Sequence, residues 1–164
     1  MRIATATLAG LGFTLALGGG WLSTRWLDGP WGMLPGGRFH GEGLPCTHER
    51  LRALADSTEV EIEARPDRPR SMTTWSVVVD GSLYVPADFL TPWKRWPYHV
   101  LEDPRIRLRA AGGILDCRAE RVEDAARIEQ LRRAIAGKYE LKPDSRAASI
   151  EVWWFQLGPR ATGG

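Results

Sequence analysis

Four residues in the first third of the chain are of the types that bind metal ions. His40, Cys46, His48 and Glu49 lie close together in the sequence, and imidazole, thiolate and carboxylate groups are common protein ligands of zinc. Their spacing matches no compact zinc motif, and the segment around them is rich in glycine. We therefore expect surface or packing roles for these residues and predict no metal site.

Cys46 and Cys117 are the two cysteines of the sequence. Outside the cytoplasm such a pair can form a disulfide, which would join the segment around Cys46 to the one around Cys117. Cys117 alternates with Leu115 and Ala119, so its side chain is expected on the buried face of a strand. Because the sequence gives no distance between the sulfur atoms, a disulfide and a buried free thiol both stay open.

Three arginines alternate along one predicted strand and therefore share a face: Arg105, Arg107 and Arg109. Such a face could bind an anion. Carboxylates elsewhere in the predicted sheet offer the opposite charge: Glu59, Glu61, Glu63 and Asp116. Pairing across neighbouring antiparallel strands is the simpler expectation.

No nucleophile and base occur in a known catalytic pattern. No motif supports Ser76 or His99, and the sequence has neither a phosphate-binding loop nor a Gly-x-Ser-x-Gly turn. We therefore predict no catalytic residue. The 164 residues are 43% hydrophobic and 26% charged, which excludes a disordered chain. The net charge of +2, with no basic block, argues against a nucleic-acid-binding protein.

Tryptophan is the most informative residue type that remains. Trp21, Trp26 and Trp31 follow an apolar segment, as aromatic residues at a membrane–water interface do. Trp153 and Trp154 are adjacent in a predicted strand, so they face opposite ways and at least one is expected on an outer surface. Exposed aromatic side chains are typical of protein interfaces. We predict interface roles for these five tryptophans.

Strand and helix patterns alternate after residue 47. Hydrophobic periodicity and turn signals predict helices at 48–55, 97–102 and 123–139, and strands at 59–64, 73–79, 82–85, 105–109, 114–122 and 149–157. Asp80-Gly81 and Gly112-Gly113 mark hairpin turns. About six strands with two or three helices predict an α+β fold built on an antiparallel barrel or rolled sheet.

The first 24 residues differ from the rest in composition. Arg2 is followed by 22 residues without a charge, and residues 3–22 as a helix would span about 30 Å, the thickness of a bilayer core. A cleaved signal peptide and a retained anchor are both open; we favour the anchor because no clear cleavage site follows. The positive-inside rule then places residues 25–164 outside the cytoplasm, in the periplasm if the anchor lies in a bacterial inner membrane.

These observations divide the chain into three parts. Residues 1–24 are predicted to be a transmembrane anchor, residues 25–57 a linker with a short helix, and residues 58–164 the barrel domain. The linker assignment rests on residues 27–46, which contain six glycines and three prolines and are therefore poorly suited to a regular helix or a central strand.

Two stretches of the predicted barrel carry a recognisable pattern: residues 74–85, TWSVVVDGSLYV, and residues 99–108, HVLEDPRIRL. The first resembles the central hairpin of the pyridoxamine 5'-phosphate oxidase-like split barrels, and the second resembles that family's helix-to-strand passage. The resemblance covers about residues 58–157. It is closer to a membrane-anchored branch with an N-terminal span and a Gly-Pro-rich segment like residues 29–42.

The resemblance implies a split barrel with a flavin mononucleotide or deazaflavin site at a dimer interface. In such proteins a basic residue near the helix and hydroxyl groups from the hairpin hold the cofactor phosphate. The residues in similar neighbourhoods of this chain are Arg70, Thr73, Thr74, Lys94 and Arg95. Trp96 and Pro97 depart from the basic or small polar pattern that the redox members usually carry.

We therefore expect a non-catalytic, membrane-anchored accessory or binding subunit that docks on and stabilises a larger respiratory or photosynthetic membrane complex. In this interpretation the chain carries no cofactor. Its partners are membrane lipid and other membrane-protein subunits, with a homodimer also open and nucleic acid excluded. The alternative is a flavin- or deazaflavin-dependent oxidoreductase of the same fold.

Overall fold

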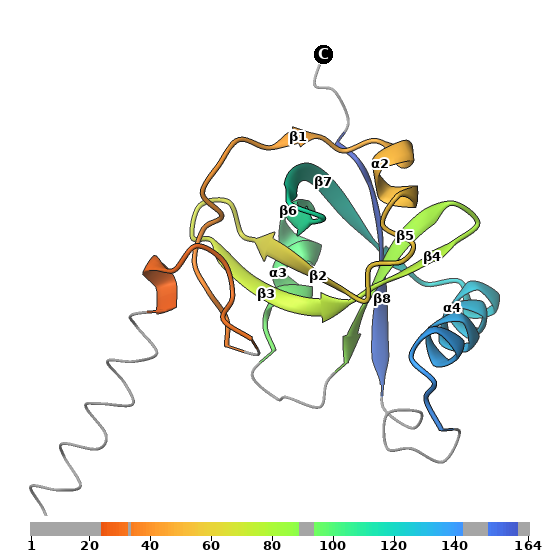
Figure 1. The fold of residues 1–164 in the computed structure, drawn as a ribbon. Coiled ribbons are helices and arrows are strands. Elements are labelled where there is room, and N and C mark those ends of the chain that lie inside the picture. Colours follow the sequence, from red (N-terminus) through yellow and green to blue (C-terminus); the bar gives the residue numbers. More distant parts are fainter. Residues whose placement is uncertain (1–23, 33, 89–93, 143–150, 161–164) are drawn as a thin grey trace, which may run out of the picture.

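The computed structural model of the chain describes residues 24–32, 34–88, 94–142 and 151–160. These residues form a rolled sheet with three α-helices around it (Figure 1). The strands are β1 (Leu44–Pro45), β2 (Glu59–Ala64), β3 (Arg70–Trp75), β4 (Val77–Val79), β5 (Ser82–Asp88), β6 (Arg105–Ala110), β7 (Gly113–Val122) and β8 (Val152–Pro159). The helices are α2 (His48–Arg52), α3 (Trp96–Glu102) and α4 (Ala125–Lys138), preceded by the short 3-10 helix η1 (Thr24–Trp26).

Tight turns connect two pairs of neighbouring strands. Asp80 and Gly81 have φ angles of 50° and 76° between β4 and β5, and Ala111 and Gly112 have φ angles of 48° and 77° between β6 and β7. Positive φ at both central residues is characteristic of the commonest two-residue hairpin turn. The predicted turn at Asp80-Gly81 is confirmed, and the second turn lies one residue earlier than predicted.

The strands follow the order β3-β2-β6-β7-β8-β5-β4, and β1 adds a short parallel pairing to β7. The sheet rolls until β3 reaches β5, where the Thr74 hydroxyl donates to the Pro86 carbonyl oxygen at 3.1 Å. The residues predicted as one strand at 73–79 form the end of β3 and all of β4, with a break at Ser76 where the sheet rolls. There the buried Ser76 hydroxyl donates to the Ser57 carbonyl oxygen at 3.2 Å.

Alternating side chains along the strands form two apolar layers. Phe155 of β8 is fully buried inside the roll, and Trp96 of α3 packs on it with ring centroids 5.1 Å apart. Trp154, the preceding residue in β8, faces the other way and is buried with Leu131 and Ile135 of α4. The roll and the layer under α4 therefore share β8 as a common wall.

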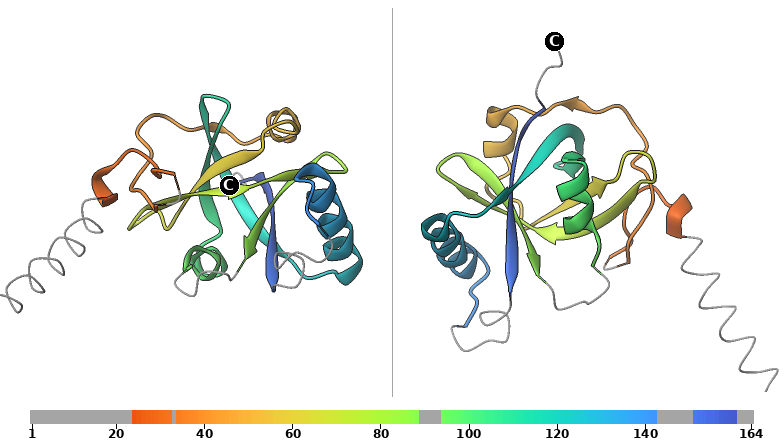
Figure 2. Two further views of the ribbon diagram at one scale, coloured as in Figure 1. Left: turned by 60° about the horizontal axis from the view of Figure 1, so that its bottom comes forward. Right: turned by 180° about the vertical axis from the view of Figure 1, so that it is seen from behind.

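The last turn of α4 is fixed to the sheet by one ammonium group. Lys138 Nζ donates to the carbonyl oxygens of Ala55, Ser57 and Ser76 at 2.9, 2.7 and 3.0 Å. An ammonium group has three hydrogens, so all of them bind backbone oxygens. Burial lowers the pKa of Lys138. Figure 2 shows α4 on the opposite side of the molecule from η1.

Residues 34–46, which we call the strap, run across the outside of the sheet before β2 begins. Gly36 exchanges backbone hydrogen bonds of 2.9 and 3.2 Å with Ser71 of β3, and at its other end the strap pairs with β7 as β1. A side chain at Gly36 would place its Cβ 1.6 Å from the Gly29 carbonyl oxygen. Glycine at this position therefore allows the strap to lie against the preceding turn.

The predicted fold class requires correction. The described residues form eight strands rather than about six, because β1 and the break at Ser76 add two. No helix among them is long and apolar enough to cross a membrane. The predicted N-terminal transmembrane helix is thus not part of the described fold, and its residues 3–22 lie outside the described residues.

The predicted location is corrected by the same finding. A single-pass protein of the bacterial inner membrane with a periplasmic barrel required a spanning helix, and the described part of the chain has none. The division into residues 1–24, 25–57 and 58–164 is not tested by the structure and stays a prediction.

Candidate functional site

The five residues predicted to hold a cofactor phosphate come from two elements. Arg70 begins β3 and Thr73 and Thr74 lie toward its end, whereas Lys94 and Arg95 directly precede α3. Arg95 occupies the position before the first residue of that helix. Because β3 and α3 are separate in sequence, only the fold decides which of these side chains share one site.

The hydroxyl groups of the two predicted threonines already donate to backbone carbonyl oxygens. The Thr73 hydroxyl donates to the Gly32 carbonyl oxygen at 3.2 Å, and the Thr74 hydroxyl donates to the Pro86 carbonyl oxygen. A hydroxyl has one hydrogen, so neither can donate to a phosphate without giving up its present bond. Adjacent residues of a strand also point to opposite faces of the sheet.

The two basic residues before α3 differ in how far their charge is compensated. Lys94 Nζ lies 2.7 Å from Asp88 Oδ2, and both side chains are partly exposed. The Arg95 side chain is exposed, and no residue in the described ranges forms an ion pair with it. Arg95 is thus the better candidate for an incoming anion.

Two further arginines lie at the turn between β2 and β3. Arg70 pairs with Ala64 across β2 and β3, which sets it beside Arg65 at the turn that follows β2. His99 of α3 connects this turn to Arg95. Its pKa is lowered first by burial and then by the positive charges of Arg65 and Arg95, while Glu102 opposes the shift.

We call Arg65, Arg70 and Arg95 the cation cluster. Guanidinium groups bind phosphate oxygens in a bidentate manner, and the lowered pKa of His99 disfavours its positively charged form. The sequence analysis missed Arg65. Its signal was the Arg65-Pro66-Asp67 turn between two predicted strands, which returns the chain beside Arg70.

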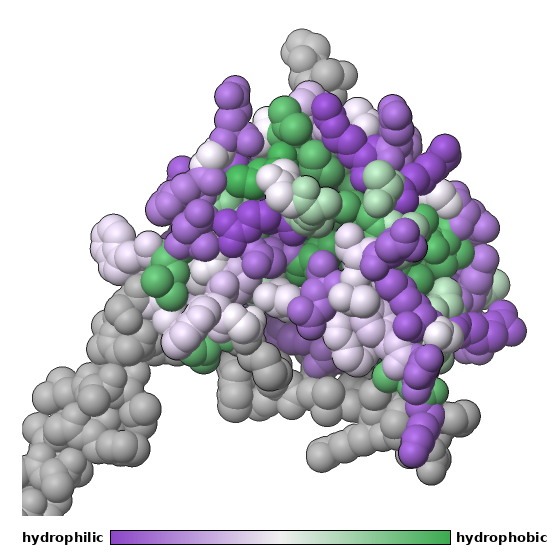
Figure 3. Space-filling view, in the orientation of Figure 1, coloured by the Kyte–Doolittle hydropathy of each residue, from purple (hydrophilic) through white to green (hydrophobic). Residues whose placement is uncertain are grey.

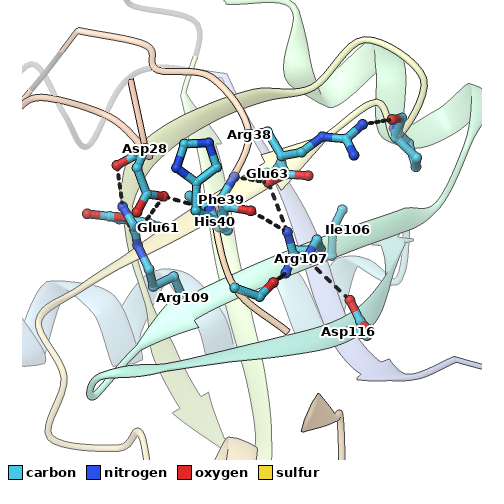
Figure 4. A network of polar contacts seen from close by, with 12 residues as sticks. Asp28, Arg38, Phe39, His40, Glu61, Glu63, Ile106, Arg107, Arg109 and Asp116 are labelled. Atoms are coloured by element: carbon cyan, nitrogen blue, oxygen red, sulfur yellow. Dashed lines mark hydrogen bonds and ion pairs between the residues drawn. The ribbon is translucent and has the colours of Figure 1, made fainter. Parts of the chain in front are cut away.

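A second polar assembly lies where the strap crosses β2 and β6 (Figure 4). Arg109 pairs with Glu61, opposite in register, at 2.5 Å, and with Asp28 at 2.8 Å. The backbone N–H of His40 and then the Arg109 guanidinium lower the pKa of Asp28. Arg109 thereby joins the sheet to the chain segment that precedes the strap.

Arg107 likewise joins the sheet to the strap, at Phe39 and Gly41. It donates to the carbonyl oxygens of Phe39 and Gly41 at 2.7 and 2.6 Å, and it lies 3.6 Å from Glu63 and 3.5 Å from Asp116. Glu63 is buried and accepts the Phe39 backbone N–H at 2.5 Å. The expected cross-strand pairing thus holds for Arg107.

Arg105, the third member of the predicted arginine face, differs from the other two. It pairs with Asp103, two residues earlier in the chain, through hydrogen bonds of 2.6 to 3.1 Å. The three arginines therefore do not form a single anion site on one face of β6.

A disulfide joins Cys46, at the end of the strap, to Cys117 of β7, with the Cα atoms 5.1 Å apart. The sequence left open a disulfide and a buried free thiol, and the structure contains the disulfide. Cys46 is consequently not available as a metal ligand. Within the described ranges, no three His, Cys, Asp or Glu side chains are placed to hold a metal ion together.

The predicted interface tryptophans occupy different environments. Trp26 and Trp31 are 86% and 74% exposed. Trp153 is half-buried, with the Arg121 guanidinium 3.9 Å above its ring. Trp154 is buried under α4 of the same chain. Trp21 lies outside the described residues.

Neither the known family models nor the curated proteins include a match to this sequence. Three similar solved structures are a conserved hypothetical protein of Mycobacterium tuberculosis, ChuZ of Campylobacter jejuni and a putative pyridoxamine 5'-phosphate oxidase of Listeria innocua. Their sequence identities to this chain are 14%, 10% and 13%, and their TM-scores are 0.51, 0.51 and 0.49.

The matches differ in how much of each protein they cover. They include 74%, 68% and 70% of this chain and 87%, 52% and 94% of the M. tuberculosis, C. jejuni and L. innocua proteins. The chain thus spans about half the length of ChuZ. At these identities the likeness concerns the fold. It supports a split-barrel-like fold and does not extend to the membrane-anchored branch that the sequence resembles.

Proposed function

We propose that this chain binds the phosphate of a flavin or deazaflavin cofactor at the cation cluster and acts as an oxidoreductase. The observation that carries the proposal is that the charges of Arg65 and Arg95 both act on His99, with Arg70 next to Arg65 at the turn between β2 and β3. The L. innocua protein is named a putative pyridoxamine 5'-phosphate oxidase, and an oxidase activity is compatible with this proposal. Because its identity to this chain is 13%, the proposal rests on this chain's own arginines.

Each member of the cation cluster would contribute differently to phosphate binding. The exposed Arg95 is accessible to an incoming phosphate, whereas Arg65 and Arg70 are half-buried at the strand turn. His99 would add a neutral hydrogen-bonding group, since its lowered pKa disfavours a fourth positive charge. Thr73, Thr74 and Lys94 would stay in their present bonds. A bound flavin or deazaflavin would supply the hydride-transfer chemistry.

Neither of two hollows formed by the described residues lies at the cation cluster: one is under the strap and one is between β7 and α4. We infer that a second copy of the chain completes the ring site, which makes a homodimer part of the proposal.

The test is the affinity of the purified full-length chain for flavin mononucleotide and for riboflavin, which lacks the phosphate. Quenching of flavin fluorescence measures both, and the same titration with a deazaflavin follows its own fluorescence. We expect Arg95→Gln to weaken flavin mononucleotide binding about tenfold, since a hydrogen bond to a charged group contributes about 1.5 kcal/mol or more. Riboflavin binding should not change.

Arg132→Gln is the matched control, because Arg132 is an exposed arginine on α4, far from the cation cluster. Failure of the unmodified chain to bind either cofactor at millimolar concentration would refute the proposal. Equal losses for flavin mononucleotide and riboflavin in Arg95→Gln would also refute a phosphate role for the cation cluster.

The accessory-subunit function is not favoured by any observation on the described residues. Its predicted partners, membrane lipid and other membrane-protein subunits, remain predictions. The exposed Trp26 and Trp31 are compatible with a protein partner, but nothing in the described part of the chain identifies one.

A further inference from the structure

A hollow of about 530 Å³ lies between the strap, the β2–β3 turn and the start of β6. Its volume is within the range of small-molecule sites, about 300 to 1,000 Å³. Four arginines line it: Arg38 of the strap, Arg105 and Arg107 of β6, and Arg160 after β8. Figure 3 shows hydrophilic residues in purple at the upper left of the molecule, the region where the strap runs in Figure 1.

The two carboxylates in the wall of the hollow already have internal partners. Glu63 accepts the Phe39 backbone N–H and lies beside Arg107 (Figure 4). Asp116 Oδ1 lies 3.5 Å from Arg107 and 3.5 Å from Arg160. Arg107 and Arg160 therefore balance the charges of these two acids, and Arg105 pairs with Asp103. Arg38, which forms no ion pair within the described ranges, leaves the hollow with an excess of positive charge.

Backbone carbonyl oxygens also orient two of these arginines. Arg38 Nη2 donates to the Pro66 carbonyl oxygen at 3.2 Å. Arg160 donates through Nε to the Cys117 carbonyl oxygen at 3.1 Å and through Nη2 to the Ile106 carbonyl oxygen at 2.8 Å. Backbone carbonyls fix the direction of a guanidinium group while leaving its net charge in place.

Arg38, Arg105 and Arg160 each also keep a guanidinium N–H group that has no hydrogen-bond acceptor among the described residues. Within the described ranges, the Nη1 groups of Arg38, Arg105 and Arg160 form no hydrogen bond. Arg105 donates to Asp103 through Nε and Nη2. Its remaining nitrogen, Nη1, therefore points away from that carboxylate. Three fixed guanidinium groups with spare donors around one hollow form an arrangement suited to an oxyanion.

We propose that this hollow, the strap pocket, binds a small molecule that carries a carboxylate or phosphate group, with Arg38, Arg105 and Arg160 as donors. Both groups offer a pair of oxygens to which a guanidinium group can donate two parallel hydrogen bonds. The strap pocket is distinct from the cation cluster and does not depend on the flavin proposal. One of its walls is the strap, so the site exists only while the strap is docked.

Calorimetric titration of the full-length chain with sodium phosphate and with sodium citrate, at ionic strength held constant with sodium chloride, tests this inference. We expect saturable binding of at least one of the two anions. Binding of phosphate alone assigns the site to phosphate esters, and binding of citrate alone assigns it to carboxylates. Absence of saturable binding for both overturns the inference.

Substitutions separate the strap pocket from other cationic surfaces. Arg38→Gln should weaken binding about tenfold, the loss of a charge-assisted contact, and Arg132→Gln should not change it. Arg38 is exposed, so we expect its variant to fold, and far-UV circular dichroism checks that; Arg160→Gln is the second variant. If Arg95→Gln abolishes binding while Arg38→Gln and Arg160→Gln do not, the anion binds the cation cluster and the inference is wrong.

Discussion

Replacing Glu63 by alanine tests whether the buried carboxylate holds the strap on the sheet. The substitution removes the acceptor of the Phe39 backbone N–H, 2.5 Å away, and the carboxylate 3.6 Å from Arg107. Glu63 is 5% exposed, so water cannot readily replace it. Breaking a buried pair of this kind costs about 3 to 5 kcal/mol, because the remaining groups stay desolvated without a partner.

A loss of this size is a large part of the total stability of a domain, which is about 5 to 15 kcal/mol. For a chain of this length, each 1 kcal/mol shifts the melting temperature by about 2 to 4 °C. We therefore expect Glu63→Ala to melt at least about 6 °C below the unmodified chain. Thermal unfolding followed by circular dichroism measures the shift, and urea unfolding measures the change in free energy.

Glu61→Ala is the control for that experiment. Glu61 lies in the same strand and also pairs with an arginine, Arg109, but its side chain is 30% exposed. Partly exposed pairs are screened by water, so we expect a loss of about 1 kcal/mol or less. A Glu63→Ala variant that loses no more stability than Glu61→Ala would refute the account of how the strap is held.

Two further predictions concern the disulfide and α4. Because the Cys46–Cys117 bond spans 71 residues of sequence, Cys46→Ser should lower the free energy of unfolding by about 2 to 4 kcal/mol; urea unfolding with and without a dithiol reductant measures this, and equal curves would contradict it. Lys138→Met should cost about 1.5 to 3 kcal/mol, since three carbonyl oxygens lose a charged donor. The lowered pKa of Lys138 means that the unfolded chain binds the proton more tightly, so stability should rise with pH from the lowered value toward the ordinary 10.5, and the variant should lack this rise. Urea midpoints across that pH range measure it, and parallel profiles would count against the assignment.

Local sequence patterns predicted most of the elements because each depends on neighbours along the chain. The alternation of residues 59–64 gave a half-buried strand that matches β2, and the Asp80-Gly81 pair gave the β4–β5 turn. Pro97 lies in the first turn of α3, where its missing N–H is tolerated. The break at Ser76 could not be predicted, since it follows from the roll of the whole sheet.

The candidate site depended on register, which no local pattern contains. Arg70 was predicted from the resemblance, and the turn at Arg65-Pro66-Asp67 indicated a nearby arginine, but the pairing of Arg70 with Ala64 was needed to place the two side by side. The strap was expected as a linker packed on the barrel. Its docking through Arg107 and Glu63 joins residues 68 and 24 positions away from Phe39 in sequence, and such contacts are decided by the complete fold.

The disulfide also determines how the molecule would carry a mechanical load. Tension applied at Thr24 would pass along the strap to Cys46 and from there through the covalent bond into β7. β7 is held by β6 on one side and β8 on the other, so the force would be shared by the middle of the sheet. The helix α2, between the two cysteines, would be bypassed by the covalent bond. Reduction of the bond would send the load through α2 before it reached the sheet at β2.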